Sequence, residues 1–127
     1  MKPPIHALAD AVALGRAAAA VGFDWPALAG VLDKVAEEHA ELLEAVAGGD
    51  PAAIESELGD LLFALASVAR HLDIDPERAL AGASTRFRAR FAAIEDSLAA
   101  DGLTWDDLTL DEMEVRWQRA KGMTPHR

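Results

Sequence analysis

Apolar residues recur at helical spacing along two long stretches of this chain. Between residues 54 and 72, and again between residues 80 and 98, they fall on one stripe of an α-helix. The residues on these stripes are Ile54, Leu58, Leu61, Leu62, Leu65, Ala69 and Leu72, followed by Leu80, Phe87, Phe91, Ile94 and Leu98. Period-two alternation rich in β-branched residues is not sustained anywhere. The pattern therefore predicts an all-α protein in which both stripes face a core.

Prolines, glycines and capping residues divide the chain into predicted helices. The first four cover residues 7–20, 26–47, 51–72 and 76–100. Pro26 suits the first turn of the second helix, and Asp50-Pro51 and Asp75-Pro76 each combine a cap with a proline at the first helical position. Thr109 and Glu112 form a capping-box pattern for a short last helix that ends near residue 122. Short loops predict a four-helix-bundle-like core with a short additional C-terminal helix.

Length and composition indicate one domain over residues 1–127 and exclude several kinds of chemistry. The chain is 51% hydrophobic, which is ample material for one core. It has no cysteine, so any metal must be bound through oxygen or histidine. No run approaches the roughly 18 apolar residues of a membrane span, and the N-terminus lacks the features of a signal peptide. We therefore expect a cytoplasmic protein with no membrane partner.

The charge of the chain is acidic overall and unevenly distributed. A formal net charge of −10 argues against a nucleic-acid partner, because binding a phosphate backbone relies on a basic surface. Residues 33–60 carry nine acids against one base, Lys34, whereas nine of the twelve Lys and Arg residues lie from Arg70 onward. This distribution suits a site that binds a cation and then the anion that the cation bridges. On composition alone, however, a merely solvated acidic surface is the preferred interpretation.

Two pairs of acids stand at helical spacing on consecutive predicted helices. Glu38 and Glu41 are three residues apart on the second helix, and Glu57 and Asp60 are three apart on the third. The second pair borders the apolar stripe, where carboxylates cost desolvation energy unless a positive charge compensates. An all-oxygen ligand set favours a hard cation, Mg²⁺ or Mn²⁺, and Mg²⁺ commonly shares its ligands with substrate phosphates.

A longer pattern surrounds these acids. It runs Glu37-Glu38-x-x-Glu41, fifteen residues, then Glu57-x-x-Asp60-Leu61-Leu62-Phe63, and it resembles the signature of MazG-type nucleoside triphosphate pyrophosphohydrolases. The likeness extends over most of the chain, through Gly22-Phe23-Asp24-Trp25-Pro26, Lys34-Val35, Ala69-Arg70-His71-Leu72, Arg86-Phe87, Arg90-Phe91 and Trp117-Gln118-x-x-Lys121. Ser84 and Arg86 depart from the Asn and Lys that are usual in the family, so a lysine contact becomes a guanidinium fork at 86.

The resemblance implies a fold, a reaction and a set of site residues. It implies an all-α homodimer or higher oligomer that hydrolyses nucleoside triphosphates to the monophosphate and pyrophosphate with Mg²⁺. The implied metal ligands are Glu38, Glu41, Glu57 and Asp60. The implied substrate-binding residues are Lys34, Arg86, Arg90, Trp117 and Lys121. Glu37 and Glu41 are both candidates for the acid that activates the attacking water.

Two other functions fit the same residues. One is a base-selective all-α dUTP or dCTP diphosphatase with the same metal chemistry. The other is a non-catalytic helical dimerisation module that keeps the acids for stability. Away from the acids, we interpret Phe23 and Trp25 as packing residues at a helix junction and Trp105 as a loop anchor. His39 and His71 are interpreted as structural or solvated and are left out of the site.

Overall fold

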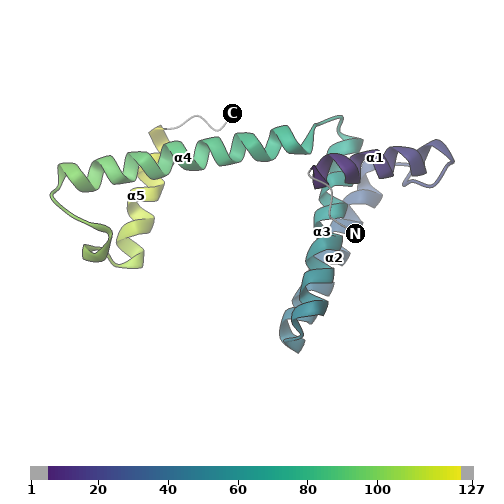
Figure 1. Cartoon of the computed structure of the whole chain (residues 1–127), viewed down its shortest axis with the longest axis horizontal. Coiled ribbons are helices and arrows are strands. Elements are labelled where there is room, and N and C mark those ends of the chain that lie inside the picture. Colours follow the sequence, from purple (N-terminus) through teal and green to yellow (C-terminus); the bar gives the residue numbers. More distant parts are fainter. Residues whose placement is uncertain (1–5, 124–127) are drawn as a thin grey trace. The chain divides into compact units, whose positions relative to one another are not determined.

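The structure is a computed structural model, and it describes residues 6–123 (Figure 1). Its elements are α1 (Ala7–Ala20), α2 (Leu28–Gly48), α3 (Pro51–His71), α4 (Pro76–Ala100), the short 3₁₀-helix η1 (Trp105–Asp107) and α5 (Leu110–Met123). No strand occurs within these residues, so the all-α, bundle-like class and the short last helix are confirmed. Along the same part of the chain, no helix combines the length and apolar character needed to cross a bilayer.

Most helix starts follow the capping residues named above. The Asp50 carboxylate accepts a hydrogen bond from the Ala52 amide at 3.2 Å, and Asp75 does the same for the amide of Glu77 at 3.0 Å. At α5, the Thr109 amide donates to the Glu112 carboxylate at 3.0 Å, and the Glu112 amide donates to the Thr109 hydroxyl at 3.2 Å. The predicted caps of α3, α4 and α5 are therefore confirmed.

The start of α2 differs from the prediction. Pro26 lies before the helix, and Ala27, with an extended backbone of φ −147° and ψ 156°, is the residue that precedes its first turn. A proline is compatible with the first turn of a helix, but it does not oblige the helix to begin at its own position. The short helix η1, closed by Thr104 and Asp107, was also not predicted.

The chain divides into two compact units, Met1–Glu77 and Arg78–Arg127, and each is described by itself. The prediction of one domain over residues 1–127 stays a prediction. In the first unit, α3 packs along both α2 and α1. Residues 49–50 connect α2 to α3, and Gly49 adopts the left-handed conformation (φ 76°) that lets a helix end within one residue.

The core of the first unit is built from small side chains. Val31 is fully buried on α2, and Ala64, Ala66 and Ser67 are buried on α3. On α1, a methyl group added at Gly15 would lie 2.6 Å from Nε of Arg70, so the glycine is what allows this close approach. The predicted stripe is wrong as a core face of the single chain, because four of its leucines are 45–48% exposed: Leu58, Leu62, Leu65 and Leu72. Helices in contact through alanine and serine leave the larger side chains on another face.

The second unit has an aromatic core. Ile94, Leu98 and Ala120 are buried together, with Trp105 and Trp117 partly buried against them. The rings of Phe91 and Trp105 stack at 5.0 Å, which confirms Trp105 as a loop anchor. The stripe on α4 is buried only towards its C-terminal end, whereas Leu80 and Phe87 near its start are 56% and 55% exposed. The core prediction for these two residues is wrong in the single chain.

An ion cluster ties the loop between α1 and α2 to the end of α3. Arg70 donates to both carboxylate oxygens of Asp24, at 2.8 and 3.0 Å, and Nε2 of His71 lies 3.0 Å from Asp24 Oδ1. The hydrogen bond from Arg70, followed by the one from His71, holds the pKa of Asp24 well below its usual range. Phe23, in the same loop, is 80% exposed, so its assignment as a packing residue is wrong.

Candidate active site

Three acids converge where α2 and α3 pack side by side. Glu38 and Glu41 lie one turn apart on α2, and Glu57 lies on α3. Each offers a carboxylate oxygen, and these three oxygens all lie within 4.8 Å of one another. Helical spacing brings the first two together, and the α2–α3 contact brings the third. The structure thus assembles three of the four predicted metal ligands.

Two of these carboxylates have buried oxygens without a partner. Glu38 is 5% exposed, and Oε2 of Glu38 and Oε2 of Glu57 are both buried and receive no hydrogen bond. A buried oxygen with an unsatisfied charge costs more than a buried neutral group. A divalent cation would supply the missing positive charge, and carboxylate oxygens are the ligands that Mg²⁺ and Mn²⁺ prefer. The residues present therefore fit a hard divalent cation.

The pKa of Glu41 shows the excess of negative charge. The charge on Glu38 raises the pKa of Glu41 above its ordinary value of 4.5, and partial burial and the charge on Glu57 act in the same direction. The neighbouring negative charges thus disfavour the ionised form of Glu41 in the absence of a cation. The cluster is thus short of positive charge where its carboxylates meet.

Lys34 supplies one positive charge at the α2 side of the cluster. Its Nζ lies 2.9 Å from Glu38 Oε1 and 3.4 Å from Glu37 Oε2. The hydrogen bond to Glu38 is the main cause of the raised pKa of Lys34. Glu37 itself is more than half exposed and lies outside the three-acid cluster. Glu37 therefore does not belong to the group of carboxylates that meet between α2 and α3.

Asp60 is exposed and is not one of the three converging acids. It does line a cavity of about 310 Å³ together with Glu38 and Lys34. The predicted fourth ligand thus lies beside the cluster, and its role stays a prediction. Trp25, Phe63 and Ser67 line the same cavity. The sequence analysis does not predict these residues as part of the site. It interprets Trp25 as a packing residue and gives Phe63 no role beyond its place in the motif.

The remaining predicted residues belong to the second unit. Arg86 and Arg90 lie one turn apart on α4, and Trp117 and Lys121 lie one turn apart on α5. Arg90 is 7% exposed, and its guanidinium carbon is 5.8 Å from the centre of the Trp117 ring. Nε and Nη2 of Arg90 are buried and have no hydrogen-bond partner. Substrate binding by these four residues stays a prediction.

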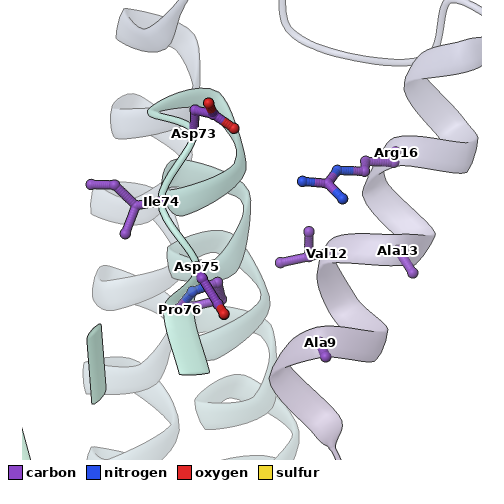
Figure 2. A pocket seen from close by; sticks show the side chains of 8 residues that line it. All are labelled: Ala9, Val12, Ala13, Arg16, Asp73, Ile74, Asp75 and Pro76. Atoms are coloured by element: carbon purple, nitrogen blue, oxygen red, sulfur yellow. The ribbon is translucent and has the colours of Figure 1, made fainter. Parts of the chain in front are cut away.

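Another cavity of the first unit lies away from the acids. It measures about 380 Å³ and lies between α1 and the segment that joins α3 to α4. Figure 2 shows Arg16 extending from α1 towards the segment that carries Asp73 and Asp75. None of the predicted site residues lines it. Its size alone does not connect it with the acidic cluster.

Comparison with known proteins decides the family. The MazG nucleotide pyrophosphohydrolase domain matches residues 28–92, which include the four predicted metal ligands. The chain belongs to this MazG family. The matched segment also runs from α2 across the boundary of the two compact units into α4.

Two curated relatives match over nearly the whole chain. The nucleoside triphosphate pyrophosphohydrolase/pyrophosphatase MazG of Thermotoga maritima is 39% identical over 122 residues, covering 96% of this chain and 47% of the relative. A nucleoside triphosphate pyrophosphohydrolase of Escherichia coli is 43% identical over 121 residues, covering 92% and 45%. YabN of Bacillus subtilis, an uncharacterised protein, is 41% identical over 68 residues. The chain therefore spans about half the length of the first two relatives.

Proposed function

We propose that this MazG-family chain hydrolyses nucleoside triphosphates to the monophosphate and pyrophosphate with Mg²⁺, or with Mn²⁺ in its place. The observation that carries the proposal is the pair of buried, unpartnered oxygens of Glu38 and Glu57 in a cluster of three acids. Two relatives that match most of the chain bear the name of this activity. Glu38, Glu41, Glu57 and Asp60 are the proposed ligands, with Asp60 completing the set from the adjoining cavity.

The reaction requires attack of water on the α-phosphorus and departure of pyrophosphate. A cation held by these acids would supply positive charge to the phosphate oxygens and would make a neighbouring water more acidic. An acid outside the ligand set, or one only partly committed to it, then takes the proton of the water. Glu37 and Glu41 are the candidates for this base, because the first lies beside the cluster and the second lies within it.

The basic residues have roles that follow from their charge. Lys34, already paired with Glu38, would bind a phosphate oxygen next to the acids. Arg86 and Arg90 on α4 would neutralise the pyrophosphate leaving group, for which a guanidinium fork is suited. Lys121 on α5 would contact a phosphate, and Trp117, one turn before it, would contact the nucleotide. The family match over residues 28–92 includes Lys34, Arg86 and Arg90.

We also propose that the protein is a homodimer. The half-exposed leucines Leu58, Leu62 and Leu65 stand at helical spacing on α3, and each is 45–48% exposed. A second copy that covers this face would remove the leucines from water and stabilise both chains. Analytical ultracentrifugation of wild type and Leu62→Lys tests this: we expect a dimer that the charge dissociates. A wild-type monomer at micromolar concentration would contradict it.

The activity is tested with a panel of nucleoside triphosphates. Wild-type protein is incubated with each in Mg²⁺ and, separately, in excess EDTA, and pyrophosphate and phosphate are measured. We expect pyrophosphate from several bases in Mg²⁺ and none in EDTA. Turnover of a single base would favour a dUTP- or dCTP-selective enzyme. No product from any triphosphate would support a non-catalytic module and overturn the proposal.

A further inference from the structure

The loop between α1 and α2 forms one wall of the cavity beside the acids. Trp25, in this loop, lines the cavity together with Lys34, Glu38 and Asp60. Among the described residues that line it, Trp25 alone lies outside α2 and α3. Helix packing holds the other lining residues in place, whereas a loop residue needs contacts of its own to stay at the cavity. Whatever holds the loop therefore also determines the shape of this cavity.

The second half of this loop is held by a side chain rather than by its backbone. The amides of residues 21–23 donate to carbonyls at the end of α1. Within the part of the chain that the structure describes, no amide of residues 24–27 donates to a backbone carbonyl. The Trp25 amide instead donates to Asp24 Oδ1 at 2.9 Å. The carboxylate of Asp24 thus takes the place of a backbone acceptor in this half of the loop.

Asp24 is in turn anchored by the end of α3. The Arg70 guanidinium donates to its Oδ2 at 2.8 Å and to its Oδ1 at 3.0 Å, and Nε2 of His71 lies 3.0 Å from Oδ1. The Arg70 side chain is 10% exposed and that of Asp24 is 19% exposed, so salt screens their attraction only weakly. A two-pronged guanidinium contact fixes direction as well as distance. The loop is therefore fixed to α3 at the residue immediately before Trp25.

Close contacts at two glycines limit how far these groups can move. A methyl group at Gly15 on α1 would lie 2.6 Å from Nε of Arg70, so α1 lies against the guanidinium. A methyl group at Gly30 on α2 would lie 2.9 Å from Cδ1 of Trp25, so the indole lies against α2. Closely packed groups transmit a displacement, because no free space absorbs it. A displacement of Arg70 would therefore reach Trp25 through Asp24.

We propose that Asp24 and Arg70 are positioning residues for the reaction, and that their ion pair holds Trp25 at the wall of the cavity beside the acids. The proposal rests on the proposed function, which places the phosphates next to Lys34 and Glu38. Neither member of the pair lines the cavity, so both act through the loop. The carboxylates that meet between α2 and α3 belong to the helices. Breaking the pair therefore weakens substrate binding and leaves Mg²⁺ binding intact.

Steady-state kinetics test the pair. Asp24→Asn and Arg70→Gln are compared with Asp33→Asn, which removes a negative charge from an exposed position on α2. All are assayed with ATP in Mg²⁺ at a temperature at which circular dichroism shows each protein to be folded. We expect both changes to raise KM by about 10-fold, within the roughly 100-fold that a misplacement of about 1 Å can cost, with a smaller change in kcat. Asp33→Asn leaves both constants unchanged.

Two further results distinguish positioning from general stability. The double variant Asp24→Asn/Arg70→Gln should have the KM of a single variant, because both changes break the same ion pair. Calorimetry should give all three variants the Mg²⁺ affinity of wild type. Unchanged KM in the folded single variants, additive effects in the double variant, or a parallel loss of Mg²⁺ affinity overturns the proposal.

The fluorescence of Trp25 reports its position without turnover. In Trp105→Phe/Trp117→Phe, Trp25 is the one tryptophan left. Asp24→Asn and, separately, Asp33→Asn are introduced into this protein, and quenching by acrylamide is measured below the unfolding transition. We expect Asp24→Asn to increase the quenching, because the indole is no longer held, and Asp33→Asn to leave it unchanged. Equal quenching in the two proteins overturns the proposal.

The experiments separate the two failures. If wild-type protein releases pyrophosphate while KM and Trp25 quenching are unchanged in Asp24→Asn, the positioning role is wrong and the proposed function stands. If no triphosphate is hydrolysed, the proposed function is wrong, and the quenching of Trp25 still decides whether Asp24 holds the loop.

Discussion

The first unit contains two clusters of charged side chains that differ in how their charge is satisfied. In one cluster, Asp24 accepts two hydrogen bonds from the Arg70 guanidinium and lies 3.0 Å from His71. In the other, the acids Glu38, Glu41 and Glu57 meet, and buried oxygens of Glu38 and Glu57 have no partner. Both clusters join α3 to another part of the unit, the first to the loop before α2 and the second to α2 itself.

One acid in each cluster has a shifted pKa, and the two shifts are opposite in direction. Hydrogen bonds from Arg70 and His71 lower the pKa of Asp24, whereas the charge on Glu38 raises the pKa of Glu41. The ionised form of Asp24 therefore stabilises the folded chain, whereas the ionised form of Glu41 destabilises it in the absence of a cation. This contrast is the physical reason to assign structure to the first cluster and ligand binding to the second.

The largest expected effect is on activity, from a change in the glutamate cluster. Glu57→Gln keeps the shape of the side chain but removes its charge, so we expect Mg²⁺-dependent pyrophosphate release to fall by about 100-fold or more, beyond the 10- to 100-fold typical of groups that only support a metal ligand. The matched control is Glu55→Gln, an exposed glutamate on the same helix, which we expect to retain full activity. Equal activity of both variants would show that Glu57 is no more important for the reaction than Glu55.

The next effect is on stability, from a change in the Asp24 cluster. Asp24→Asn removes the charge that pairs with Arg70, whose side chain is 10% exposed. A guanidinium left in this position without its counter-charge is costly, so we expect the melting temperature to fall by several degrees in thermal unfolding. Asp33→Asn, at an exposed position on α2, serves as the control and should lie within about 0.5 kcal/mol of wild type. An Asp24→Asn protein as stable as wild type would show that the cluster is not structural.

A second stability test concerns Gly15 on α1, which lies against the side chain of Arg70. We expect Gly15→Ala to destabilise the protein by about 1–3 kcal/mol, because the new methyl group would meet an Arg70 side chain that Asp24 holds in place. Gly59→Ala on α3 is the control, since nothing lies within 4 Å of the added group, and it should stabilise by up to about 1 kcal/mol through helix propensity. Both values come from denaturant unfolding. Stabilisation by Gly15→Ala would show that the Arg70 side chain moves aside at little cost in free energy.

The smallest effect is the pH dependence of the metal-free protein. A raised pKa means that folded Glu41 binds a proton more readily than the unfolded chain does, so its unfavourable contribution is present at neutral pH and disappears as the pH falls through the raised value towards 4.5. The favourable contribution of Asp24 has the opposite sign: it is present above 3.8 and is lost only in stronger acid. We expect mild acidification from pH 7 to stabilise wild type in EDTA relative to Glu41→Gln. Identical pH profiles for the two proteins would contradict the shift at Glu41.

Local features of the fold were predictable because neighbouring residues determine them. The range Ala7–Ala20 of α1 and the caps at Asp50, Asp75 and Thr109 agree with the structure, since each depends on residues within a few positions. The start of α2 was placed two residues early because Pro26 is compatible with both a helix start and the preceding turn. Whether a stripe of leucines is covered is decided by contacts that spacing does not specify.

The site was predictable to the same extent. The pairing of Glu38 with Glu41 follows from helical spacing, and their meeting with Glu57 follows from two helices joined by a short turn. The bond between Asp24 and Arg70 joins residues 46 positions apart, and no periodic pattern indicates it. Nor does any periodic pattern place Trp25 in one cavity with Lys34, Glu38 and Asp60. The sequence pattern does not predict such long-range contacts between single residues.

Direct titration of the metal-free protein with Mg²⁺ tests the central claim, which is that the unsatisfied glutamate cluster is a divalent-cation site. Isothermal titration calorimetry would be performed on wild type and on Glu38→Gln, which removes the most buried of the three carboxylates. We predict saturable binding by wild type and at least a 10-fold loss of affinity in the variant. Equal affinity in the two proteins would contradict the claim, and so would the absence of binding by wild type.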